Sequence, residues 1–488
     1  MSTDPPRKGP ELIFSTVRPL GIDGDTFVDA LRTHLANYSY ALEVIKVSDL
    51  ISKLLPEGAI SPTTPEDERI RTLIDAGDEE CETRQSSAAF ACYAVAEILY
   101  RRNAETGSPR TALPRTAYLI DSIKRTEEVD LLQRIYGDRY VQFGLKSNTP
   151  NRHRALADKL ATSQFSKSKE TIDRTVSDLM ERDQKEEGKF GQKVAKAFPR
   201  SDVFIDYDGD LSDQIGRFFS LFFGDPNYKT PKPMEFGMNL AYVSSTRSSE
   251  LGLKVGAAIV DDNDHIISLG YNHHPTDPDQ SPAYDASSNE INSLVLDTLR
   301  ALKDDALNDE TREKLAARPE EFVRELLKGS LNTARIRDLV EFQLTVHAEM
   351  SALIAALERG GISPGQTIYV TAYPCHGCAK HIVAAGLNVV YLEPYPKSRA
   401  EAMYGESVKN FSPFIGIAPS RYDTLFRVLD ERKTSTGERI RWDRKARSLA
   451  IPKVSALTDQ GEVAKREEAA LTLLAPNEDN QTMTTEMP

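Results

Sequence analysis

The sequence of 488 residues is poor in cysteine, with only Cys81, Cys92, Cys375 and Cys378. So few cysteines exclude a disulfide framework in a chain of this length. No stretch approaches the 18 consecutive apolar residues that a membrane helix needs, and no apolar segment follows the first basic residues, so we expect neither a membrane span nor a secretory signal. We therefore expect a cytoplasmic protein, in which a Cys-x-x-Cys pair more often binds metal or does redox work than forms a cross-link.

Positive charge is also in deficit, because 61 Lys and Arg residues face 74 Asp and Glu residues, which gives a net charge of −13. An acidic surface repels nucleic-acid backbones, so the composition favours a small anionic substrate over a long polynucleotide. Apolar residues make up 40% and charged residues 28%, as in soluble globular proteins. The length predicts two or three domains.

The segments 1–165 and 166–232 differ in pattern. Strand-like and helix-like stretches alternate in the first, beginning with the apolar run Glu11–Val17, and this order predicts a parallel α/β domain. The second is rich in charge and has long stretches without three apolar positions per two turns, so we expect a charged helical linker.

A second α/β domain is predicted over residues 233–450. Its strand–helix alternation is interrupted by a long, charged, helical insertion at about 285–340. Residues 451–488 are polar and poor in apolar side chains, which is typical of a disordered tail.

Two short motifs in the second domain, "VHAEM" and "PCHGC", hold a histidine and two cysteines at the starts of predicted helices. Zinc prefers such nitrogen and thiolate ligands, and catalytic zinc sites use three protein ligands and leave one position open. Cys375 and Cys378 are three residues apart, so at a helix start both sulfurs project to one side. The positive end of that helix favours thiolates. We predict a Zn²⁺ site formed by His347, Cys375 and Cys378.

Glu349 lies two residues after His347 and is the predicted catalytic residue. A carboxylate beside the metal can take a proton from an attacking water and pass it to a ring nitrogen, which hydrolytic loss of an amino group requires. The pattern H-x-E followed by P-C-x-x-C is the known signature of zinc nucleobase deaminases. A thioredoxin-like redox pair is the main structural alternative, but it explains neither His347 nor Glu349.

The stretch from about 236 to 425 resembles the deoxycytidylate (dCMP) deaminase family. The matching pieces, in that family's order, are "TRSSELGLKVGAAIV", "SLGYNHHP", "VHAEMSALI" and "TAYPCHGCAKHIVAAGLNVVYLEPY". The resemblance implies a cytidine deaminase-like α/β/α sandwich, with Glu349 as proton shuttle. It also implies that Asn272 contacts the nucleotide and that the backbone of Ala348 helps to hold the pyrimidine. Lys254, near a predicted strand end, is a candidate for contact with a substrate phosphate.

The loop Pro19–Thr26, "PLGIDGDT", follows the first strand and partly matches the phosphate-binding pattern G-x-x-x-x-G-K-[ST]. Pro19 replaces the first glycine, and Asp25 replaces the lysine and would repel phosphates. Gly21, Gly24 and Thr26 remain candidates for contact with an anion. The first domain therefore resembles a degenerate P-loop NTPase-like nucleotide kinase.

The two-domain order resembles bacterial anti-phage deoxycytidine nucleotide deaminases. This resemblance implies conversion of dCTP or dCMP to dUTP or dUMP, and thereby depletion of deoxycytidine nucleotides during phage infection. A regulatory nucleotide in the first domain and an inhibitory small RNA are further expectations. We also expect a homo-oligomer without membrane contact.

Two other functions remain open. A tRNA or single-stranded DNA deaminase, acting on cytidine or adenosine, would share the zinc site but would need a basic, aromatic-lined groove. A binding or switch protein with a vestigial deaminase fold would not need Glu349.

Overall fold

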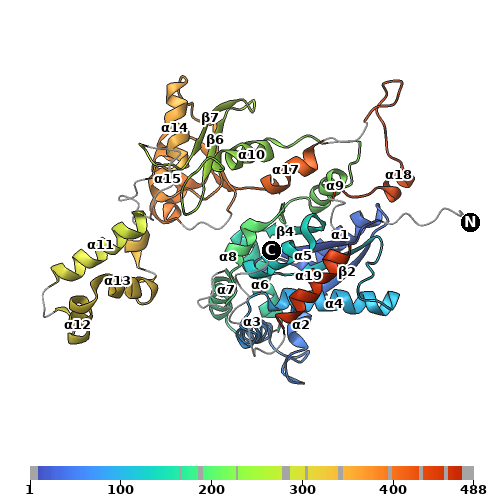
Figure 1. The fold of residues 1–488 in the computed structure, drawn as a ribbon, viewed down its shortest axis with the longest axis horizontal. Coiled ribbons are helices and arrows are strands. Elements are labelled where there is room, and N and C mark those ends of the chain that lie inside the picture. Colours follow the sequence, from blue (N-terminus) through green and yellow to red (C-terminus); the bar gives the residue numbers. More distant parts are fainter. Residues whose placement is uncertain are drawn as a thin grey trace, which may run out of the picture. The chain divides into compact units, whose positions relative to one another are not determined.

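The structure is a computed structural model that describes residues 9–163, 167–184, 191–226, 229–276, 286–302, 306–332, 334–338, 345–393, 398–427, 432–454 and 460–474. The chain forms two compact units (Figure 1). The first comprises Met1–Glu235 together with Ile415–Pro488, and the second comprises Phe236–Phe414. The first unit is therefore discontinuous in sequence.

The first unit is built on a six-stranded sheet in the order β11-β5-β4-β1-β3-β2. All pairs are parallel except β5 with the short β11. Every residue of β1 and β3 is buried, as expected for parallel strands covered on both faces. The predicted parallel α/β arrangement is thus confirmed. The strands are β1 (Leu12–Val17), β2 (Ala41–Lys46), β3 (Thr116–Asp121), β4 (Tyr140–Lys146), β5 (Val203–Asp206) and β11 (Gly416–Ile417).

Helices α1 (Gly24–Ala36) and α9 (Leu211–Phe222) pack together over one face of this sheet, where Phe14, Phe143 and Phe219 belong to one buried cluster. Helices α4 (Ala89–Thr106), α5 (Thr126–Tyr136) and α19 (Gln460–Thr472) pack against one another, and α5 also contacts β4. The remaining helices of the unit are α2 (Val47–Ser52), α3 (Glu66–Thr83), α6 (Thr149–Ser163), α7 (Lys169–Gln184), α8 (Val194–Ala197), α17 (Pro419–Phe426) and α18 (Arg444–Leu449).

The structure differs from the predicted linker at 166–232. Within this range β5 pairs with β4, and α9 contributes Phe218, Phe219 and Phe222 to the main core. Helix α7 places Ile172, Val176 and Leu179 in a second buried cluster with α3 and α6. The charged residues of α7 lie outside this apolar stripe, which is narrow but continues along the helix.

The C-terminal region also differs from the prediction. Residues 415–450 belong to the first unit, although we predicted them in the second domain. Part of the predicted disordered tail is the helix α19, in which Val463, Glu467 and Ala470 are buried. Residues 455–459 and 475–488 of that predicted tail lie outside the described residues.

The second unit has a five-stranded sheet in the order β10-β9-β8-β6-β7, in which β8, β9 and β10 are parallel and β6 is antiparallel to both neighbours. Helices α14 and α15 share a buried cluster with one face of the sheet. Helix α10 covers the other face, since Gly237 and Gly256 bring it against β8 and β6. The predicted α/β/α sandwich is confirmed. Its elements are α10 (Pro233–Ser245), β6 (Gly256–Val260), β7 (Ile266–Tyr271), α14 (Ala348–Glu358), β8 (Thr367–Val370), α15 (His376–Ala384), β9 (Asn388–Tyr391), α16 (Ala400–Tyr404) and β10 (Phe411–Pro413).

The predicted insertion is helical where it is described, with α11 (Ala286–Ala301), α12 (Asp309–Ala317) and α13 (Pro319–Lys328). Its remaining residues include 303–305 and 339–344, which lie outside the described residues. Among the helices of the described part of the chain, none combines the length and apolar character needed to cross a membrane.

Candidate metal centre

The three predicted metal ligands lie at the starts of two helices. His347 is the N-cap residue of α14, and Cys375 is the N-cap residue of α15, both with extended backbones. Cys378 follows within the first turn of α15. Each helix therefore presents its amino-terminal end, and hence its positive dipole end, to the same place.

The donor atoms of the three side chains meet. Nδ1 of His347 lies 3.4 Å from Sγ of Cys375 and 3.5 Å from Sγ of Cys378. Two ligands of a tetrahedral zinc ion lie about 3.6 Å apart, because Zn–N is about 2.0 Å and Zn–S about 2.3 Å. All three donor atoms lie within 4.8 Å of one another. The two thiols and one imidazole thus fit zinc in both chemistry and spacing.

The surroundings of Cys375 favour its thiolate. A hydrogen bond from the Cys378 thiol lowers the pKa of the Cys375 thiol well below its ordinary value, and His347 lowers it too, against the opposing effect of burial. The backbone amide of Cys378 also donates to Sγ of Cys375, at 3.4 Å. The hydrogen bond with Cys375 in turn raises the pKa of His347. The thiolate is the form that binds a metal.

Glu349 lies in the first turn of α14 and is only 4% exposed. Burial raises the pKa of Glu349, and the negative charge of Cys375 adds to that effect. A buried carboxyl group holds a proton more readily than an exposed one, and gaining and releasing a proton is what a general acid or base does.

Small residues bring α14 close to the sheet. A Cβ atom on Gly270 of β7 would lie 2.3 Å from the carbonyl oxygen of Ala348 and 2.4 Å from the amide nitrogen of Ala352. The hydroxyl of Ser268 donates to the carbonyl of Ala352 at 2.8 Å. The start of α14, which carries His347 and Glu349, is therefore fixed by direct backbone packing against β7.

A cavity of about 290 Å³ adjoins the cluster. Its walls include the three ligands together with Met350 of α14 and His381 of α15.

Comparison with known proteins places this cluster in a family. Residues 232–393 match the model of the cytidine and deoxycytidylate deaminase zinc-binding region. The deaminase region implies Zn²⁺ as its metal, in agreement with the His347, Cys375 and Cys378 cluster.

The relatives of the deaminase region include phage proteins. The deoxycytidylate deaminase of Enterobacteria phage T2 is 29% identical over 33% of this chain and 80% of its own length. That of Enterobacteria phage T4 is 28% identical over 33% of this chain and 78% of its own. Among solved structures, dCMP deaminase from the cyanophage S-TIM5 aligns with 38% of this chain and 99% of its own at 19% identity, with a TM-score of 0.23.

Of the three predicted substrate-binding residues, Ala348 follows the metal ligand His347, whereas Asn272 contacts the segment that carries Lys254. Ala348 is buried as the first residue of α14. Asn272 is 8% exposed, and its side chain accepts from the amide of Val255 at 2.7 Å and donates to the carbonyl of Leu253 at 2.9 Å. Asn272 therefore fixes the segment around the exposed Lys254. Contact of these residues with a substrate stays a prediction.

No sequence motif indicated the residues that support the cysteine loop. The hydroxyl of Tyr404, on α16, donates to the carbonyl of His376 at 3.0 Å, between the two cysteines. The ring of Tyr373, just before that loop, packs against Tyr391 and Phe411. Neither tyrosine belongs to the ligand motif of this chain, so only the folded structure shows that they support the metal ligands.

The predicted phosphate loop lies in the first unit, between β1 and α1. Gly21 has φ +91° and lies against the backbone of Arg152, where a Cβ atom would be 2.4 Å from the carbonyl oxygen. Gly24 is the first residue of α1, and the hydroxyl of Thr26 donates to Asp23 at 2.8 Å. The predicted role of Gly21, Gly24 and Thr26 in phosphate binding stays a prediction, as does the P-loop type of the domain.

Proposed function

We propose that this protein is a zinc-dependent deoxycytidylate deaminase, which converts dCMP and water to dUMP and ammonia. The observation that carries the proposal is the meeting of His347, Cys375 and Cys378 beside the buried Glu349, within a region that matches the deaminase model. The phage relatives named deoxycytidylate deaminases support dCMP as the substrate.

His347, Cys375 and Cys378 would hold the zinc ion. Zinc at this place supplies Lewis-acid activation of the water that attacks C4 of the cytosine ring. The chain itself must move protons, because the ring nitrogen N3 and the leaving amino group both gain one during the reaction.

Glu349 is the residue for that proton transfer. Its carboxylate takes one proton from the attacking water and delivers it to N3 of the ring. It then passes the remaining hydroxyl proton to the amino nitrogen, so that the C4–N bond breaks with release of ammonia and a C4 carbonyl remains. Because Glu349 is buried, the proton is kept from bulk water between these steps.

Substrate placement would come from the neighbouring backbone. The amide end of α14 at Ala348 faces the metal site, and the segment held by Asn272 carries Lys254, whose ammonium group suits a phosphate. We extend the proposal to dCTP as a second substrate and to depletion of deoxycytidine nucleotides as a defence against phage. A regulatory nucleotide, an inhibitory small RNA and oligomer formation remain expectations of the family resemblance.

The test is product analysis with the purified full chain after its zinc content has been measured. We expect deoxyuridine nucleotide and an equal amount of ammonia from dCMP, with dCTP as a parallel sample to rank the two substrates. Zinc-loaded protein that forms no deoxyuridine product from either nucleotide would refute the proposal.

A further inference from the structure

The carboxyl ends of β1, β2 and β3 border a cavity of about 420 Å³ in the first unit. This edge of a parallel sheet is where α/β proteins usually bind ligands. The loop between β1 and α1, singled out in the sequence as a partial phosphate-binding pattern, forms one wall of the cavity. The polar contacts around this loop decide whether a phosphate can use it.

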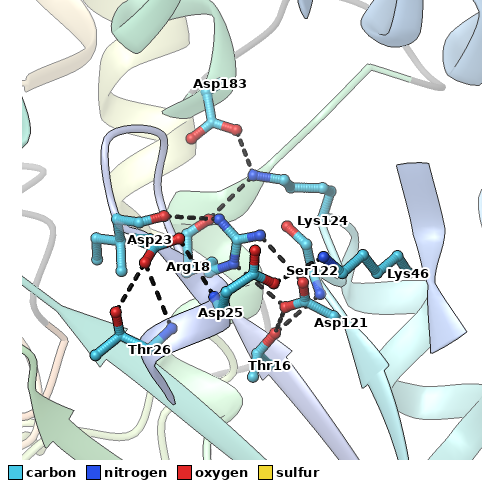
Figure 2. A network of polar contacts seen from close by, with 11 residues as sticks. Thr16, Arg18, Asp23, Asp25, Thr26, Lys46, Asp121, Ser122, Lys124 and Asp183 are labelled. Carbon is cyan, nitrogen blue, oxygen red and sulfur yellow. Dashed lines mark hydrogen bonds and ion pairs between the residues drawn. The ribbon is translucent and has the colours of Figure 1, made fainter. Parts of the chain in front are cut away.

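The start of α1 already holds an anion, the side chain of Asp23. Its Oδ1 accepts from the amide of Asp25 at 3.3 Å, and its Oδ2 accepts from the amide of Thr26 at 3.4 Å (Figure 2). The hydroxyl of Thr26 donates to the same Oδ2 at 2.8 Å. These amides and this hydroxyl are the groups that a phosphate at the helix end would use.

A third amide of the loop is also bound to a carboxylate. The amide of Leu20 donates to Asp183 at 2.8 Å, and Pro19 has no N–H group to offer. Lys124 donates to both Asp183, at 2.6 Å, and the carbonyl of Arg18, at 3.0 Å (Figure 2). The first half of the loop is therefore also fixed by side chains from other segments.

The guanidinium of Arg18 lies over the beginning of α1. A Cβ atom on Gly24 would be 2.9 Å from one of its nitrogens. This guanidinium donates to Asp121 at 3.1 and 3.2 Å and to the carbonyl of Ile22 at 2.8 Å. Lys46, at the end of β2, pairs with Asp25 at 2.7 Å, so the Asp25 carboxylate has a cationic partner (Figure 2).

The charges that line the cavity do not favour an additional anion. Six carboxylates and five basic side chains line it. Among these cations, Arg18, Lys46, Arg69 and Lys124 each pair with a carboxylate, and the charge of Lys159 acts on Asp23 itself. Although burial acts to raise it, the hydrogen bonds from Thr26 and the two amides hold the pKa of Asp23 below its ordinary value. Asp23 is therefore ionised at neutral pH.

We propose that the carboxylate of Asp23 occupies the phosphate position of this loop as an internal anion. A phosphate group binds the start of α1 only when that carboxylate is displaced. The first unit therefore neither binds nor hydrolyses nucleoside phosphates at this loop. Asp23 occupies the phosphate position, and Asp25 stands where a phosphate-binding loop has its lysine.

The experiment compares binding of inorganic phosphate to the wild-type full chain, Asp23→Gly and Asp210→Gly by calorimetry. Asp210 is a matched control because it is the N-cap residue of α9 in the same unit, accepts from the amide of Asp213, and does not line the cavity. Each substitution removes one N-cap side chain, and glycine is itself tolerated at that position. Only Asp23→Gly should gain phosphate affinity, by about tenfold or more, which corresponds to about 1.4 kcal/mol.

Asp23→Asn serves if the glycine variant does not fold, because asparagine caps helices as well as aspartate does. It removes the negative charge but keeps an oxygen on the amides, so we expect a smaller gain in the same direction. Wild-type protein that binds phosphate as tightly as Asp23→Gly would overturn the proposal. A folded Asp23→Gly variant that binds no more phosphate than Asp210→Gly would overturn it as well.

Discussion

At the scale of single residues, the metal ligands were predictable because their signal is local. His347 and Glu349 are two apart, and Cys375 and Cys378 are three apart, so each half of the site is set within one helical turn. The supporting hydrogen bond from Tyr404 to His376 was not predictable, because a tyrosine far along the chain carries no such spacing. The role of Asp23 was not predicted either, because the phosphate-binding pattern specifies the glycines and the lysine but not the residue at position 23.

The ion pair between the partly buried Arg18 and the buried Asp121 leads to a prediction about stability in acid. Asp121 is 3% exposed, and although burial acts to raise its pKa, the charge of Arg18 holds it below the usual 3.8. A lowered carboxyl pKa contributes stability above pH 3.8 that is lost as the pH falls through the folded-state value. We expect Asp121→Asn to destabilise the first unit most at neutral pH, and the difference from wild type in urea unfolding to shrink below pH 3.8.

Asp29→Asn is the control for that measurement. Asp29 pairs with Arg32 at 3.0 Å, but both side chains are more than half exposed, so this substitution should change stability little at any pH. A wild-type advantage over Asp121→Asn that grows on acidification would contradict the assignment.

At the scale of elements, α14 depends on a glycine in the neighbouring strand. Gly270→Ala would place a Cβ atom within 2.4 Å of the backbone of α14, which cannot move without moving His347 and Glu349. We expect a loss of about 1–3 kcal/mol in unfolding free energy, together with loss of zinc from the purified protein. Gly252→Ala is the matched control, because a Cβ atom there meets nothing within 4 Å. Unchanged zinc content in Gly270→Ala would show that the close packing of α14 against β7 does not position the metal ligands.

Helix α19 is joined to the first unit by a buried ion pair. Arg102 of α4 donates to Glu467 at 2.8 and 2.9 Å and also binds Glu11, and all three residues are buried. We expect Glu467→Ala to cost about 3–5 kcal/mol in urea unfolding, because it breaks a buried charge network. The adjacent Glu468 pairs with Arg110 at an exposed site, so Glu468→Ala should cost at most about 1 kcal/mol. Equal effects of the two substitutions would argue against docking of α19.

The elements that we mispredicted share one physical cause. Helix α19 was read as a tail because its composition is polar, and its partner Arg102 lies 365 residues away. Strand β5 is only four residues long, and α9 follows it after a charged stretch, so neither was visible until the strand paired with β4. Local pattern predicted the main strands and helices, whereas membership of a sheet depends on distant partners.

At the scale of the whole molecule, the chain leaves the first unit at Glu235 and returns to it at Ile415. The completely buried Glu235 links the segment that leaves the first unit to the segment that returns to it. Its Oε1 accepts from the amide of Ile417 at 2.9 Å, and its Oε2 accepts from that of Lys232 at 2.7 Å. Arg217 neutralises this carboxylate at 2.6 Å. The sequence predicted two α/β domains, but it did not predict that the second is inserted between two segments of the first.

The net charge of −13 separates the proposed function from a polynucleotide deaminase. We expect the full chain not to be retained on labelled single-stranded DNA or tRNA at physiological salt, because acidic surfaces repel phosphate backbones. Filter binding across a salt series measures this directly. Retention that weakens steeply with salt would instead favour an editing enzyme with the same zinc site.

The central claim is that Glu349 moves protons beside a zinc ion held by His347, Cys375 and Cys378. The most direct test is the rate of dCMP deamination by Glu349→Gln, with zinc content measured on the same samples. Glu358→Gln, at the exposed end of the same helix, is the control. We predict equal zinc in all three proteins and a rate about 10²–10⁴-fold lower in Glu349→Gln alone. A zinc-loaded Glu349→Gln variant that deaminates dCMP at the wild-type rate would contradict the account.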